Sequence, residues 1–281
     1  MDELIIEPTR GWSRVDWREL VRYRDLLWLL IRRDFVSKYK QTVLGPLWFV
    51  IQPLATTLVF TVIFGRVAKI STDNLPPLLF YMCGMLGWQY FAQCLGGTSS
   101  TFVANQRLFG KVYFPRLIVP VSVVSSNLLA WAIQAGTFLG FWLYFKLFTA
   151  AGAQFGARWF AVPLLPLLLA QQAALGLGVG LWLSALTAKY RDFTHLTGFL
   201  TQLWLYATPV VYPLSVIPER WRWVSVLNPM TQVIESYRWL ALGTGTVDWR
   251  YAAVSVGMTV FVLWTGVLLF ARTEKNFIDT V

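Results

Sequence analysis

The chain has 281 residues, of which 56% are of hydrophobic types and only 14% are charged. Soluble domains average about 25% charged residues, so in water this chain would expose too much apolar surface. Its formal charge is +10, but the Lys and Arg residues gather between the apolar runs instead of interrupting them. This arrangement argues against a nucleic-acid-binding protein and predicts an integral membrane protein.

The first predicted element is an amphipathic helix over residues 13–38, with Ser13 and Asp16 resembling a capping box at its start. Helical spacing puts apolar residues on one face and mainly basic residues on the other. A helix of this kind lies in the cytoplasmic headgroup layer of a membrane. The alternative is a soluble helix that binds a partner. The apolar face holds Trp17, Leu20, Val21, Leu27, Trp28 and Ile31, and the polar face holds Arg18, Arg22, Asp25, Arg32 and Arg33.

Six long windows without Asp, Glu, Lys or Arg follow along the chain. Each exceeds the roughly 20 residues that a helix needs to cross the hydrocarbon core. Backbone polar groups in lipid must pair within their own segment, which favours helices. The fold class is therefore an all-α integral membrane protein with six transmembrane helices. The predicted spans are residues 43–65, 76–100, 117–145, 160–187, 194–216 and 251–271.

Lys and Arg are distributed unequally between the two sides of the predicted membrane. With six spans, sixteen of them lie on the side that holds both termini and eight lie on the other side. Short cytoplasmic segments are enriched in these residues, so we expect both termini in the cytoplasm.

Residues 219–245, between the fifth and sixth spans, are too long for a tight turn, and their charge-free runs are too short to cross the membrane. Asn228-Pro229 is a helix-breaking pair that divides them. We expect two short outer helices that re-enter the membrane and act as a gate at the outer end of a pore. The alternative is a hairpin on the membrane surface with no gating function.

The chain offers little catalytic or ion-coupling chemistry. Proton- and ion-coupled pumps place ionisable groups within the membrane, and the six windows hold no carboxylate or basic side chain. His195 is the only histidine, and no GxxxxGK[ST] phosphate-binding loop occurs. We therefore expect no catalytic residue, no metal and no cofactor in this chain. A membrane-embedded glycosyl- or acyltransferase stays open as an alternative, with Asp192 and His195 as the compact pair of reactive residues.

Four stretches, in order along most of the chain, form a more specific pattern. They are RDLLWLLIRRDFVSKYKQTVLGPLW at 24–48, FGKVYFPRLIVP at 109–120, AKYRDFTHLTGFLTQLWLYATPVVYP at 188–213 and LNPMTQVIESYRW at 227–239. Together they resemble the ABC-2 family of permeases. The similarity is greatest to the branch that exports O-antigen, capsule polysaccharide and teichoic acid, and it does not separate these three substrates.

This resemblance implies a single ABC-2 type transmembrane domain over residues 1–281 in the cell inner membrane. It implies a homodimer with a central channel and two copies of an ABC ATPase subunit, which would hold the ATP and Mg²⁺. The implied function is export of a lipid-linked, O-antigen-like polysaccharide from the cytoplasmic side, in a permease subunit that is not an enzyme. The alternatives are an ABC-2 permease for a drug or another lipid, and a passive channel.

The second cytoplasmic loop is the expected contact with the ATPase. Its aromatic residues suit an apolar cleft, and its basic residues suit acidic groups around that cleft. The fourth loop is a second candidate contact. The alternative is that these charges only set the topology. The candidate coupling residues are Arg107, Lys111, Tyr113, Phe114 and Arg116, with Arg191 and Asp192 from the fourth loop.

A polysaccharide channel needs rings against which the C–H faces of sugars pack, and amides or hydroxyls for the sugar hydroxyls. Spans one, two and five supply both kinds of side chain, although each ring alone is equally suited to lipid contact or packing. The channel candidates are Trp48, Phe49, Gln52, Phe60, Tyr81, Trp88, Gln89, Tyr90, Gln93, Gln202, Trp204 and Tyr206.

Basic residues gather where the N-terminal helix leads into the first span. A lipid-linked glycan carries a phosphate or pyrophosphate, which favours Arg and Lys at the cytoplasmic surface. Arg32, Arg33, Lys38 and Lys40 are therefore the candidate headgroup entry site. The alternative is that they are orientation charges beside a membrane.

Overall fold

The computed structural model describes residues 21–37, 40, 42–109, 114–190 and 192–278, with the backbone alone at Arg107 and at 275–278. These residues are helical throughout apart from turns and loops, and they contain no strand, which confirms the predicted all-α class. The α-helices are α2 (Arg24–Ser37), α3 (Trp48–Phe60), α4 (Pro77–Ser99), α5 (Thr101–Ala104), α6 (Gln106–Phe109), α7 (Ile118–Phe148), α8 (Leu165–Lys189), α9 (Phe193–Ala207), α10 (Glu219–Val226), α11 (Pro229–Ala241) and α12 (Trp249–Ile278). Between them lie the 3₁₀-helices η1 (Gly45–Leu47), η3 (Ala150–Ala153), η4 (Trp159–Leu164) and η5 (Leu214–Val216), and a π-helix, η2 (Thr61–Val67).

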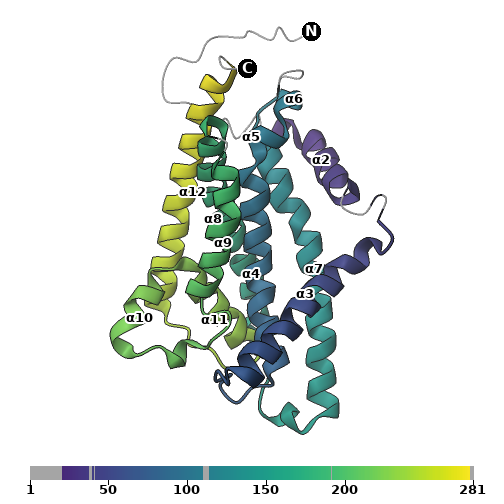
Figure 1. Ribbon diagram of the computed structural model, residues 1–281, viewed down its shortest axis with the longest axis vertical. Helices are drawn as coiled ribbons and strands as arrows, with labels where there is room; N and C mark the ends of the chain where they lie inside the picture. The colour runs from purple at the N-terminus through teal and green to yellow at the C-terminus, as the bar shows by residue number, and fades with distance from the viewer. Residues whose placement is uncertain (1–20, 38–39, 41, 110–113, 191, 279–281) are drawn as a thin grey trace.

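The long helices form an elongated bundle with α4 inside it (Figure 1). Helix α4 packs against α3, α7, α8 and α11, and α8 packs in turn against α12. Most of α4 is buried, including Tyr81, Trp88 and Tyr90. Because other helices surround α4, its amides Gln89 and Gln93 are only partly exposed.

In the part of the chain that the structure describes, four helical segments are long and apolar enough to cross a membrane: Gly45–Val67, Ile118–Phe148, Trp159–Lys189 and Trp249–Glu274. They coincide with the first, third, fourth and sixth predicted spans. The second predicted span corresponds to α4, which has 23 residues and is less apolar.

The fifth predicted span, 194–216, is too long. Helix α9 begins at Phe193 but ends at Ala207, so it has 15 residues. At 1.5 Å per residue its length is about 22 Å, short of a hydrocarbon core of roughly 30 Å. Thr208, the residue before Pro209, adopts the extended conformation that proline imposes on its predecessor, and the chain turns away.

The first span is irregular. It starts with the 3₁₀ turn η1, contains Pro53 inside α3, and continues into the seven-residue π-helix η2. Little of it is covered by the rest of the chain, since 11% of its most apolar stretch is buried. The first span therefore lies at the edge of the bundle.

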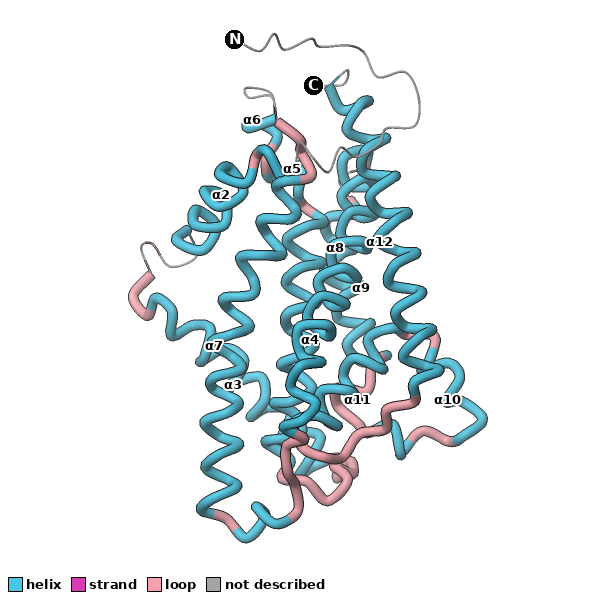
Figure 2. The backbone as a smooth tube through the Cα atoms, turned by 180° about the vertical axis from the view of Figure 1, so that it is seen from behind, coloured by secondary structure: helices cyan, strands magenta, loops and turns pink. Residues whose placement is uncertain are grey.

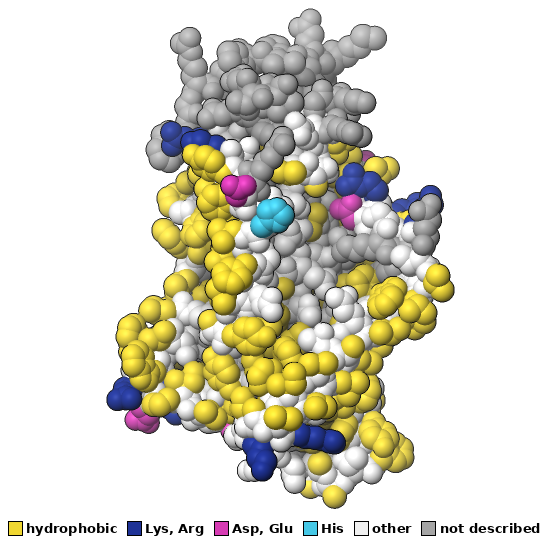
Figure 3. Space-filling view, in the orientation of Figure 1, with side chains coloured by type: hydrophobic (Ala, Val, Ile, Leu, Met, Phe, Trp, Pro, Cys, Tyr) yellow, Lys and Arg dark blue, Asp and Glu magenta, His cyan; other side chains and the backbone are white. Residues whose placement is uncertain are grey.

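Charged side chains gather at the two ends of the molecule, with a belt of hydrophobic side chains between them (Figure 3). One end holds α2, α6 and the last turns of α12, and the other holds α10 and α11 (Figures 1 and 2). Helix α2 packs on α7 through Leu30, which is buried, while Trp28 on its predicted apolar face is exposed. The first part of the predicted 13–38 helix lies outside the described residues.

Residues 219–241 form two short helices that meet at the predicted break. Asn228 caps α11, because its side-chain Oδ1 accepts a hydrogen bond from the backbone N–H of Met230 at 3.1 Å. The two helices differ in burial. Helix α11 packs into the bundle end through residues such as Ile234 and Tyr237, whereas Trp221 and Trp223 of α10 are exposed.

Candidate functional site

A cavity of about 630 Å³ opens between α2, α3, α4 and α7, at the end of the bundle where α2 lies. We call it the polar groove. Side-chain amides and hydroxyls from four helices line it, together with two aromatic rings. Its residues are Arg33, Asp34 and Ser37 from α2; Trp48, Phe49, Gln52 and Pro53 from α3; Gln89, Gln93, Gly96 and Gly97 from α4; Ser100, Ala104 and Asn105; and Val119, Val123, Ser126, Asn127 and Gln134 from α7.

Helical spacing explains why the lining is polar. Gln89, Gln93 and Gly97 follow one another at intervals of four residues on α4. They therefore lie on one face of the helix, each about one turn from the next. On α7 the same rule brings Val123, Asn127 and Gln134 to the face that meets α4. Two polar stripes thus face each other inside helices that are otherwise apolar.

Beside the groove lies a second, much smaller hollow of about 20 Å³, large enough for one water molecule. It shares Phe49, Pro53 and Gln134 with the groove, and its other walls come mainly from Met82, Met85 and further apolar side chains. The seam between α3, α4 and α7 therefore changes from wide and polar to narrow and apolar.

The polar groove brings together the predicted channel residues Trp48, Phe49, Gln52, Gln89 and Gln93. The other predicted rings lie elsewhere. Phe60, Tyr81, Trp88 and Tyr90 are buried in the core. Trp204 donates its indole N–H to Asn228 Oδ1 at 2.9 Å, and Gln202 and Tyr206 are exposed on α9.

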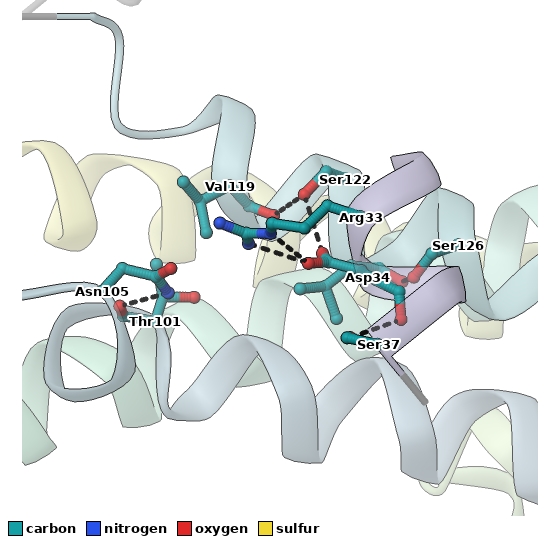
Figure 4. A network of polar contacts seen from close by, with 9 residues as sticks. Arg33, Asp34, Ser37, Thr101, Asn105, Val119, Ser122 and Ser126 are labelled. Atoms are coloured by element: carbon teal, nitrogen blue, oxygen red, sulfur yellow. Dashed lines mark hydrogen bonds and ion pairs between the residues drawn. The ribbon is translucent and has the colours of Figure 1, made fainter. Parts of the chain in front are cut away.

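Among the headgroup candidates, Arg33 lines the polar groove, and its side chain is 46% exposed. Its guanidinium donates two hydrogen bonds to Asp34 Oδ1, at 3.0 Å from Nε and 2.8 Å from Nη2 (Figure 4). Arg32 and Lys40 are exposed, and Lys38 lies outside the described residues.

Sequence reasoning missed the contribution of α7 to the groove, and it missed Asp34. The available signal was the pair of amides Asn127 and Gln134 within an apolar window. Both are buried, and amides at such positions need polar partners.

The candidate coupling residues differ in burial, and several lie outside the described residues. Phe114 is buried and lies 5.9 Å from Phe109 between ring centroids, and Arg116 is buried with its Nε 3.7 Å from Glu274 Oε1 of α12. Burial lowers the pKa of Arg116, and the Glu274 carboxylate acts in the opposite direction. Asp192 is exposed. Lys111, Tyr113 and Arg191 lie outside the described residues, and of Arg107 only the backbone is described.

Replacing Phe114 by Ala is expected to destabilise the fold, because the ring fills an internal cluster with Phe102, Phe109 and Phe270. Losing a buried Phe side chain costs about 3–5 kcal/mol. Thermal unfolding in detergent should show a lower midpoint for Phe114→Ala. The matched control is Phe148→Ala, which removes an exposed ring from the far end of α7. Equal midpoints for the two variants would contradict the internal role of Phe114.

A buried ion pair at the opposite end of the bundle was not predicted. Arg238 of α11 donates to Glu235 Oε1 at 2.9 Å and to the backbone carbonyl of Val210 at 2.9 Å, and both side chains are almost fully buried. Glu235 Oε2 also accepts the backbone N–H of Thr246 at 3.0 Å. Two opposite charges three residues apart in a largely apolar stretch were the signal in the sequence.

Among the described residues, no three His, Cys, Asp or Glu side chains lie close enough together to hold a metal ion. The described surroundings of the groove therefore offer hydrogen bonds, two rings and one ion pair. Such a lining suits a ligand that is polar and uncharged along most of its length and anionic at one end.

Comparison with known proteins identifies the family of this chain. Residues 25–242 match the family described as ABC-2 type transporter. The O-antigen export system permease protein RfbA of Myxococcus xanthus is 30% identical over 268 residues, which cover 94% of this chain and 98% of that protein. An O-antigen export system permease protein RfbA of Klebsiella pneumoniae is 26% identical, covering 91% and 94% of the two chains. The polysialic acid transport protein KpsM of Escherichia coli is 22% identical, covering 89% and 94%. Since the family match covers most of its length and a relative aligns with nearly all of it, this chain belongs to the ABC-2 type transporter family.

Proposed function

We propose that this chain is the membrane subunit of an exporter that moves a lipid-linked polysaccharide from the cytoplasmic side of the inner membrane to its outer side. A separate ABC ATPase chain, with ATP and Mg²⁺, drives the movement. The relatives named for O-antigen export and polysialic acid transport support this class of substrate.

The polar groove is the observation that carries the proposal. Its amides and hydroxyls match sugar hydroxyls, and Trp48 and Phe49 offer faces for sugar C–H groups. Many moderate hydrogen bonds of about 1 kcal/mol each allow a chain to slide without a deep energy trap. A drug-binding site would instead be mostly apolar, with few polar groups.

The functional unit in this proposal is a homodimer with two ATPase subunits. The first span is largely uncovered by its own chain, and α9 carries exposed side chains such as Phe199 and Tyr206. A second copy related by a two-fold axis would cover these surfaces and close the groove into a channel.

The proposed topology has six spans, with both termini in the cytoplasm. Helix α4 is the second span, and the short α9 together with residues 208–216 that follow it, which form no α-helix, is the fifth. Helix α2 then lies at the cytoplasmic interface, and α10 and α11 lie at the outer end, where they act as the gate. The exposed Trp221 and Trp223 of α10 support this placement, because Trp favours the membrane–water boundary.

The proposal is tested by reconstituting the chain with its ATPase in proteoliposomes that contain a radiolabelled polyprenyl-diphosphate glycan. We expect ATP-dependent appearance of the glycan on the trans side. Transport without any ATPase, or ATP-dependent transport of an unrelated drug in place of the glycan, would overturn the assignment. Turnover of the glycan by the chain alone would indicate a transferase.

Replacing Gln93 by Leu is expected to slow glycan export about fivefold, because it removes one hydrogen bond of about 1 kcal/mol from the groove wall. Replacing Gln89 as well should compound the loss. Initial rates of export in proteoliposomes measure both effects.

The matched control is Gln154→Leu, which makes the same change at an exposed position after η3, away from the groove. Its export rate should equal that of the wild type. A Gln89→Leu/Gln93→Leu variant that exports at the wild-type rate would remove the groove from the glycan path.

A further inference from the structure

Arg33 and Asp34, adjacent residues of α2, form an ion pair inside the polar groove (Figure 4). Both hydrogen bonds from the guanidinium converge on one carboxylate oxygen, Oδ1. In the described part of the chain these are the only hydrogen bonds that the Arg33 side chain makes. Among the described residues of the groove wall, the one cation is therefore occupied by its own neighbour.

Helix geometry makes this pair easy to open. Successive residues on an α-helix point about 100° apart, so neighbours do not face each other as residues three or four apart do. Arg33 and Asp34 therefore pair without the favourable alignment of residues three or four apart. The Arg33 side chain is also 46% exposed, which puts the pair among partly solvated ion pairs that stabilise a protein only weakly.

Asp34 is less exposed than Arg33, at 18%, and it has a second contact, with α7. The Ser122 hydroxyl of α7 lies 3.4 Å from Asp34 Oδ2 and 2.7 Å from the backbone carbonyl of Val119. A hydroxyl has one proton to donate, and the shorter contact favours donation to the Val119 carbonyl. Rotation of this hydroxyl would give the proton to Asp34 instead, so a donor is ready when Arg33 leaves.

We propose that Asp34 is a displaceable counter-ion: a phosphate group entering the polar groove takes over the Arg33 guanidinium, and the released Asp34 carboxylate accepts the Ser122 hydroxyl. This inference rests on the proposed function, since it assigns the groove an anionic headgroup. Asp34 is then a positioning residue that acts through Arg33.

The exchange would make the groove selective. A neutral lipid or free glycan offers the guanidinium nothing better than the carboxylate it already holds. A phosphate or diphosphate carries more charge and accepts two parallel hydrogen bonds from arginine. Only a ligand with that chemistry can separate the pair. Asp34 therefore keeps uncharged molecules from binding to the Arg33 guanidinium.

The test uses the full-length chain in phosphatidylcholine nanodiscs, with farnesyl diphosphate as the probe and farnesol as its uncharged counterpart. Binding is measured by calorimetry. Asp34→Asn should bind farnesyl diphosphate about fivefold more tightly than the wild type, the factor expected for removing an ion pair of about 1 kcal/mol. Arg33→Gln should weaken binding on the order of tenfold, as for loss of a charge-assisted hydrogen bond. Farnesol binding should not respond to either change.

The matched control is Asp25→Asn, which removes the same charge from α2 at a side chain that is 98% exposed and outside the groove. Its affinity should equal that of the wild type. Asp34→Ser removes the charge in a second way and serves if the Asn variant folds poorly. In the Arg33→Gln background, Asp34→Asn should give a markedly smaller gain, because the competition it relieves is gone.

Inorganic pyrophosphate distinguishes the two sources of the phosphate. A gain for Asp34→Asn with pyrophosphate as well as with the prenyl diphosphate identifies the free phosphate group as sufficient, and a gain with the prenyl diphosphate alone identifies the lipid-linked headgroup. Both results support displacement.

Unchanged or weaker binding of farnesyl diphosphate by Asp34→Asn, together with weaker binding by Arg33→Gln, would overturn the counter-ion role of Asp34. The proposed export function would stay intact. Wild-type affinity in Arg33→Gln would overturn the inference and remove Arg33 from the headgroup site. The export assay in proteoliposomes decides the proposed function separately.

Discussion

Replacing Arg238 by Met is expected to cause the largest loss of stability of any single change at the α10–α11 end of the bundle. The guanidinium is buried, pairs with Glu235 at 2.9 Å, and lies 3.8 Å from the centre of the Phe80 ring of α4. It also binds the carbonyls of Val210 and Tyr212, which follow α9. Its removal leaves the Glu235 carboxylate buried without its cation, at a cost of about 3–5 kcal/mol. Thermal unfolding monitored by size-exclusion chromatography in detergent should show the loss.

The exposed pair Glu219 and Arg222 on α10 provides a matched control, because it has the same spacing of three residues and a longer separation of 3.9 Å. Arg222→Met should shift the unfolding midpoint little, since exposed pairs contribute about 0–1 kcal/mol. Neutralising both buried partners, in Glu235→Gln/Arg238→Met, should recover part of the stability. An Arg238→Met protein as stable as Arg222→Met would refute the idea that this arginine joins α11, α4 and the segment after α9.

Replacing Gly266 by Val is expected to prevent α12 from packing on α8. A Cβ at Gly266 would overlap the backbone carbonyl of Gly178, and a Cβ at Gly178 would lie 2.8 Å from the backbone of Leu263. These two glycines let the helix backbones touch. Close contact of this kind stabilises helix pairs in a membrane, where the hydrophobic effect does not drive helices together. Because backbone cannot move aside as a side chain can, the cost should reach about 3 kcal/mol. The yield of monodisperse protein and its unfolding midpoint measure the effect.

Gly257 lies on the same helix and gives the control, since a Cβ there would meet no atom within 4 Å. Gly257→Val changes helix propensity in the same way but creates no clash, so its midpoint should stay near that of the wild type. Similar losses in Gly257→Val and Gly266→Val would mean that helix propensity, rather than the crossing of α8 and α12, explains the result.

The predicted spans match observed helices where a charge-free window and a helix have the same length, and they depart from them where the window outruns the helix. A window defined by missing charges ran to residue 216, but α9 ends at Ala207 because Thr208-Pro209 breaks it. Helix α4 shows the reverse case. It carries polar residues and is less apolar than the four clear candidates, yet it lies inside the bundle because its neighbours shield it.

Site prediction was limited in a related way. Tyr81, Trp88 and Tyr90 have the residue types of a sugar path, but they point into the core. Gln89 and Gln93 lie on another face of the same helix and line the groove. Residue type does not tell these faces apart, since a helix in the centre of a bundle has protein on every side.

The amino-acid sequence by itself determined that this chain forms apolar helices with its Lys and Arg residues gathered between them, because those properties depend on composition and local spacing. It also carried the pattern of the ABC-2 type transporter family. Only the tertiary structure decided which polar faces meet. The Arg33–Asp34 pair beside Ser122, and the amides of α4 opposite those of α7, depend on the rotation of each helix about its own axis. Packing contacts such as Gly178 against Gly266 set that rotation, and they join residues far apart in the chain.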